Sequence, residues 1–163
     1  MSKFKYFPSF SVAGFGQALR KNVILRNGLT SRFYSKDFPK RYRHNEFLIS
    51  AGHFFKNHPN FYDEFGFTKD NLIMGDSGGF QIASGALKWD KSLLEKVFVW
   101  LENNSDIAMN LDIPPKMKYE GKYEECLRIS KDNFKYFADN QSGNTDFLNV
   151  VQGTNELEYI SWY

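Results

Sequence analysis

The chain has 163 residues, a net charge of +2, 42% hydrophobic residues and 18% aromatic residues. These values exclude a disordered chain and fit one ordinary domain with its own core. No apolar run approaches the roughly 18 residues of a membrane helix, and the first residues lack the features of a signal peptide, so we expect a cytoplasmic protein. The single cysteine, Cys126, excludes an internal disulfide and a cysteine-cluster zinc site.

The first 45 residues are basic and have little regular pattern. They hold ten Lys or Arg and one acid, whereas the remaining residues hold eleven Lys or Arg and eighteen acids. Glycines and isolated prolines predict turns and short hairpin-like pieces here. Aromatic residues alternate with basic ones over residues 33–43, which would suit either contacts to phosphates and bases or a simple solvated surface.

An alternation of strands and helices begins at residue 46. Short β-prone runs occupy residues 46–50, 71–75, 107–113 and 147–152, and each is followed by a polar turn or one that contains Gly or Pro. Helical periodicity covers residues 91–103, with Asp90 as the N-cap, and residues 120–139. Another amphipathic helix begins near residue 155. This alternation predicts an α/β fold with a parallel sheet.

Both an open doubly wound sheet and a (β/α)8 TIM barrel fit this alternation. Distinctive polar residues follow one strand after another, at residues 50–53, 76–79, 112 and 152–153. A barrel collects ligand groups from many strand ends, so the pattern favours a barrel. A complete barrel takes about 250 residues. We therefore predict a basic segment over residues 1–45 and, over residues 46–163, the first half of a truncated barrel catalytic domain.

Two acids and an amide are the candidate functional side chains. Asp76 and Asp112 each follow an apolar run, and Gln152 ends another. The glycines after Asp76 would let backbone N–H groups and a flat ligand approach, although an isolated D-S-G-G more often forms a turn. Carboxylates accept from the N1–H and amine of guanine, and an amide can donate to its O6. Together the three side chains predict a pocket for a guanine-like ring.

Residues 76–81, Asp-Ser-Gly-Gly-Phe-Gln, closely resemble the D-S-G-G-F-Q signature of tRNA-guanine transglycosylases, the queuine or preQ1 tRNA-ribosyltransferases. Residues 111–115 resemble that family's F-D-E-C-T-P segment, and residues 150–153 resemble its I-V-Q-G. Residues 48–53 are loosely similar to its L-x-N-T-Y-H stretch. Order and spacing agree over residues 46–163, and the family includes phage relatives that insert 7-deazaguanines into DNA.

The resemblance implies a pentosyltransferase that replaces guanine in a polynucleotide, tRNA or DNA, with a 7-deazaguanine such as queuine, preQ1 or preQ0. It implies that Asp76 is the catalytic acid or base, that Asp112 binds the N1–H and amine edge, and that Phe80 lies against the ring. The other substrate-binding positions that it implies are Ser77, Gly78, Gly79, Gln81, Gln152 and Gly153.

The family's nucleophilic aspartate and its cysteine/histidine zinc site lie in the second half of its barrel, and we expect this chain to hold neither. We therefore expect no cofactor from this chain, and little turnover unless a C-terminal-half polypeptide or a dimer partner completes the barrel. A second hypothesis is a non-catalytic barrel subunit that binds RNA and supports an active partner, and a third is an unrelated barrel enzyme. His53 and His58 are candidates for contacts at the rim, or are structural.

Overall fold

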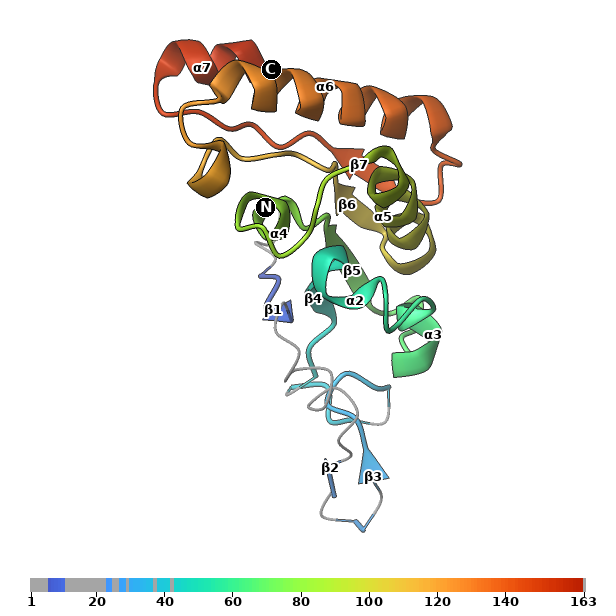
Figure 1. Cartoon of the computed structure of the whole chain (residues 1–163). Helices are drawn as coiled ribbons and strands as arrows, with labels where there is room; N and C mark the ends of the chain where they lie inside the picture. Colours follow the sequence, from blue (N-terminus) through green and yellow to red (C-terminus); the bar gives the residue numbers. More distant parts are fainter. Residues whose placement is uncertain are drawn as a thin grey trace.

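The computed structural model describes residues 6–10, 23–24, 27–28, 30–36, 38–41 and 43–162. Within these residues five strands form one sheet, in which each strand pairs in parallel with the next (Figure 1). In sheet order they are β1 (Ser9–Phe10), β4 (Glu46–Ser50), β5 (Leu72–Asp76), β6 (Ile107–Met109) and β7 (Asp146–Leu148). The chain therefore has the predicted α/β fold with a parallel sheet.

The order of the strands across the sheet is their order along the chain, without a reversal. In a doubly wound sheet the order reverses at a switch point, and ligands bind there. In this sheet, each described strand instead lies next to the sheet strand that precedes it along the chain, so the sheet extends in one direction. Their carboxyl ends consequently lie along one rim, where Ser50 is paired with Asp76 at the ends of β4 and β5.

The connecting helices are α2 (Ala51–Phe54), α3 (Phe61–Phe65), α4 (Gly79–Ala83), α5 (Lys91–Asn104), α6 (Tyr123–Asn140) and α7 (Glu156–Trp162), with a 3-10 turn η1 (Met117–Tyr119). Asp90 caps α5 as predicted, since its carboxylate accepts a hydrogen bond from the Leu93 N–H at 2.8 Å. In the part of the chain that is described, no helix combines the length and apolar character needed to cross a membrane.

The core lies between the sheet and the helices and is rich in aromatic side chains. Phe47, Ile49 and Ile73 of the central strands are fully buried. Helix α5 packs closely on β5, because a Cβ atom added to Gly75 would lie 2.5 Å from Leu101 Cδ2. This contact fixes α5 against the strand that ends in Asp76. Figure 1 shows α6 and α7 together beyond β7, and the two helices are in contact.

Several elements differ from the sequence-based expectation. β6 ends at Met109 rather than at residue 113. Asn110 N still donates to the Leu148 carbonyl of β7 at 2.9 Å, but Ile113 N donates to Ser130 Oγ at 2.8 Å. β7 is three residues long, and α6 begins after Gly121, whose φ is +74°. The parallel sheet also gains β1, from a region predicted to be irregular.

Part of the basic segment is described. β2 (Val23–Ile24) and β3 (Thr30–Ser31) pair antiparallel, which matches the predicted hairpin-like piece. Arg32 and Tyr34 both donate hydrogen bonds to the Phe65 carbonyl, which ties this segment to the end of α3. The basic residues that lie outside the described part of the chain are Lys3, Lys5, Arg20, Lys21 and Arg26.

Candidate functional site at the carboxyl ends of the strands

Asp76 ends β5 and faces a pocket on the rim of the sheet. The pocket has a volume of about 500 Å³, which is within the range of small-molecule sites. Phe80 on α4 is 60% exposed and contributes an aromatic face to it. Asp76 Oδ1 also accepts a 3.4 Å hydrogen bond from Gly78 N, the turn contact of an isolated D-S-G-G sequence. The other residues that line the pocket are Ser9, His53, Gln81, Ser84 and Ala86.

Asp112 and Gln152 form a second, buried part of the site. Asp112 is 7% exposed, and Gln152 Nε2 donates a hydrogen bond to its Oδ2 at 2.8 Å. Burial raises the pKa of Asp112 from 3.8 to about 6; the Gln152 hydrogen bond lowers that pKa, and the negative charge of Asp76 raises it. The two acids are therefore close enough for the charge of Asp76 to raise the pKa of Asp112, and the Gln152 amide is hydrogen-bonded to Asp112. Neither Asp112 nor Gln152 lines the pocket beside Asp76.

Three glycines bring the ends of three strands into contact through main-chain atoms. A Cβ atom on Gly78 would lie 2.7 Å from the Gly52 Cα, and one on Gly52 would lie 2.8 Å from Gln81 Oε1. A Cβ atom on Gly79 would collide with the carbonyl oxygen of Asp112. The space on the Cβ side of Gly78 and Gly79 is thus filled by protein, so these glycines serve close packing there. Their packing holds the Asp76 turn against the Asp112 segment.

A buried polar network, which the sequence analysis missed, supports the same segments. Ser77 Oγ donates to the Asn110 carbonyl at 2.8 Å, and both side chains are almost fully buried. The Asn110 side chain accepts from Val150 N at 3.3 Å and donates to the Ser130 carbonyl at 3.4 Å. Ser77 is therefore a link between strand ends. The available signal for Asn110 was a polar residue within the apolar run of residues 107–113.

The remaining candidates separate into rim and structural positions. Gln81 Nε2 lies 2.9 Å from His53 Nε2 on the pocket wall. His58 is structural: its Nδ1 lies 2.7 Å from Glu64 Oε2, and its ring contacts Phe54, Phe61 and Phe65. Gly153 packs against α7, since a Cβ atom there would lie 3.0 Å from Glu158 Cβ and from Tyr159 N.

The residues present do not fit the zinc site that the resemblance implies for the complete family barrel. Cys126 is fully buried on α6, and burial raises the pKa of its thiol to about 11, which opposes the thiolate that a metal needs. Within the described ranges, no cluster of three or more His, Cys, Asp or Glu side chains could hold a metal ion.

Comparisons with protein-family models, with curated proteins and with solved structures find no match to this chain. The interpretation of the site therefore depends on the geometry of its side chains and on the motif at residues 76–81. In that geometry, Asp76, Phe80 and Gln81 line the pocket, while Asp112 and Gln152 lie beside the Asp76 turn.

Proposed function

We propose that this chain carries the base-binding part of a tRNA-guanine transglycosylase-like enzyme, which replaces guanine in a polynucleotide with a 7-deazaguanine. The observation that carries the proposal is the convergence of Asp76, Asp112 and Gln152 at one rim of the sheet. A motif match alone would be weak support. The two acids and the amide of this site follow three different strands, and a shared ligand requires that they lie close together.

The roles follow from the chemistry of each group. Asp112 is a buried carboxylate beside the Asp76 pocket and accepts a hydrogen bond from the neutral Gln152 amide. A guanine-like ring that displaces this amide offers the carboxylate two N–H donors. The Gln152 amide is then free to contact the carbonyl edge of the ring. Asp76, half-buried at the pocket mouth, exchanges a proton with the departing or entering base. Phe80 stacks on the face of the ring.

We further propose that the sheet is the first half of a (β/α)8 barrel. Support comes from the parallel pairing and from a strand order that follows the chain without reversal. Barrels also take their active-site groups from the carboxyl ends of successive strands. The remaining strands and the nucleophile that attacks the ribose would then lie outside the residues of this sheet.

An exchange assay tests the proposal. The chain is incubated with labelled guanine and either tRNA or duplex DNA, with and without the polypeptide encoded directly downstream, and the label in the polynucleotide is counted. We expect incorporation of label in the sample that contains both polypeptides, and Asp76→Asn should abolish it. Asp146→Asn, which changes an exposed carboxylate on β7, is the control and should leave incorporation unchanged.

Binding of the free base is measured in parallel, by equilibrium dialysis with labelled guanine. Exchange that survives Asp76→Asn would remove Asp76 from the mechanism. Polynucleotide binding without guanine binding in any sample would overturn the proposed enzyme and favour a non-catalytic RNA-binding subunit.

A further inference from the structure

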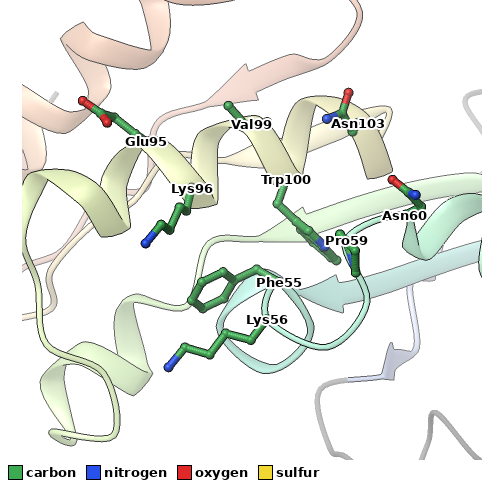
Figure 2. Close-up of a pocket in the computed structure, with 9 residues that line it drawn as sticks. All are labelled: Phe55, Lys56, Pro59, Asn60, Glu95, Lys96, Val99, Trp100 and Asn103. Carbon is green, nitrogen blue, oxygen red and sulfur yellow. The ribbon is translucent and has the colours of Figure 1, made fainter.

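Two neighbouring hollows lie between α5 and the segment that follows α2, close to the candidate pocket. The larger, of about 600 Å³, is drawn in Figure 2, and the smaller has about 240 Å³. Phe55, Lys56 and Lys96 line both, so the two form one continuous groove. Val99 and Trp100 extend its apolar floor at one end, and Leu87 and Lys88 line it at the other.

Lysine side chains line the groove beside its apolar residues. Lys56, Lys88 and Lys96 are exposed, and within the described part of the chain no ion pair neutralises them. In Figure 2 the side chains of Lys56 and Lys96 extend to the same side, while the carboxylate of Glu95 points away from them. Two acids also line the groove, Glu95 in the larger hollow and Asp90 in the smaller, and the Asp90 carboxylate accepts a hydrogen bond from the Leu93 N–H at the start of α5.

The groove is joined to the candidate pocket by a short anchored loop. Ser84 and Ala86 line the pocket beside Asp76, and the next residues along the chain, Leu87 and Lys88, line the groove. Ser84 Oγ and Leu87 N both donate to the Gln81 carbonyl, at 3.1 and 3.0 Å. The position of Lys88 is therefore tied to the helix that carries Phe80 and Gln81.

We propose that this lysine groove binds the phosphate backbone of the single-stranded polynucleotide segment whose base enters the pocket beside Asp76. The inference rests on the proposed function and adds the path of the strand. Three exposed lysines around the half-buried ring of Phe55 match a flexible anionic chain, because lysines track its phosphates. The Lys56 ammonium lies 5.6 Å from the centre of the Phe55 ring, and a nucleobase stacks on that ring when Lys56 moves to a phosphate.

The test is the salt dependence of strand binding. Fluorescein-labelled RNA and DNA 12-mers of one guanine-containing sequence are titrated with the full chain between 50 and 200 mM salt, and binding is read by anisotropy. Each phosphate contact contributes about 0.7 to the slope of log K against log salt for single strands. The triple change Lys56→Gln, Lys88→Gln and Lys96→Gln should therefore reduce the slope by about 2. Wild-type affinity should fall about 20-fold more than variant affinity across this range.

A triple variant of exposed lysines outside the groove serves as the control: Lys69→Gln, Lys131→Gln and Lys135→Gln, of which Lys135 is paired with Asp139 on the surface of α6. It should keep the wild-type slope, and circular dichroism should show that both variants are folded. Phe55→Leu should weaken binding about fivefold or more with no change of slope, because it removes stacking and not charge. The ratio of RNA to DNA affinity identifies which polynucleotide the groove prefers.

Equal slopes for wild type and the groove variant, equal losses in both triple variants, or no binding of either 12-mer by wild type would overturn the inference. Each of these results leaves the proposed function standing if labelled guanine still binds. Loss of guanine binding in the wild-type chain would instead overturn the proposed function, whatever the slopes show.

Discussion

Asp112→Asn should stabilise the protein at neutral pH. Burial raises the pKa of Asp112 from 3.8 to about 6, so the folded state binds this proton more tightly than the unfolded chain does. The contribution of Asp112 to the free energy of unfolding is therefore fully present below pH 4 and is lost as pH rises through about 6. A difference of about two pKa units corresponds to about 3 kcal/mol. Asn keeps an oxygen for the Gln152 amide and has no charge to desolvate.

The assay is urea unfolding of wild type and variant at several values between pH 4 and pH 8. The difference in the free energy of unfolding should be near zero at pH 4 and should reach about 3 kcal/mol in favour of Asp112→Asn at pH 8. Asp146→Asn controls for the loss of a negative charge. A difference that stays constant with pH, or that favours wild type at pH 8, would refute a desolvated Asp112 carboxylate.

Three further outcomes follow from the site. Guanine binding by equilibrium dialysis should be about tenfold weaker at pH 5 than at pH 8, because the carboxylate of Asp112 must be ionised to accept the N–H donors; a flat profile would contradict this role. Gly79→Ala should cost about 3 kcal/mol or more in urea unfolding, because the new methyl group meets the Asp112 carbonyl, and a cost below about 1 kcal/mol would show that the loops can separate. Asp90→Ala should lower the free energy of unfolding by about 1 kcal/mol through loss of the α5 cap, whereas no change would show that the cap is replaced by water.

The local elements of the central fold could be predicted because their signals are local. The strand runs at residues 46–50 and 71–75 lie within one residue of β4 and β5, and the N-cap at Asp90 is confirmed. The run at residues 107–113 was too long as a strand, since Leu111 and Ile113 are fully buried without belonging to the ladder. An apolar run indicates that its residues are buried, but a segment forms a strand only where its backbone pairs with a neighbouring strand.

The site could be predicted to the level of which strand ends meet, and no further. Parallel strands place their carboxyl ends on one rim, which is enough to bring Asp76 and Asp112 together. The bond from Gln152 to Asp112 depends on one side-chain conformation, and the hub at Asn110 depends on which carbonyls lie opposite it. β1 was missed for a related reason: a two-residue strand carries no periodic pattern and is defined by its partner.

The contacts at Gly52, Gly78 and Gly79 have a consequence for how this protein could change its preferences. The close approach of Gly78 to the Gly52 backbone and of Gly79 to the Asp112 backbone sets the spacing between the Asp76 turn and the Asp112 segment, and the Gln81 side chain packs on Gly52 and Gly78. Phe80, which is 60% exposed, can consequently be exchanged, by selection or by design, without shifting the two acids. A library at position 80 would thus vary the aromatic face of the pocket while the positions of Asp76 and Asp112 stay the same.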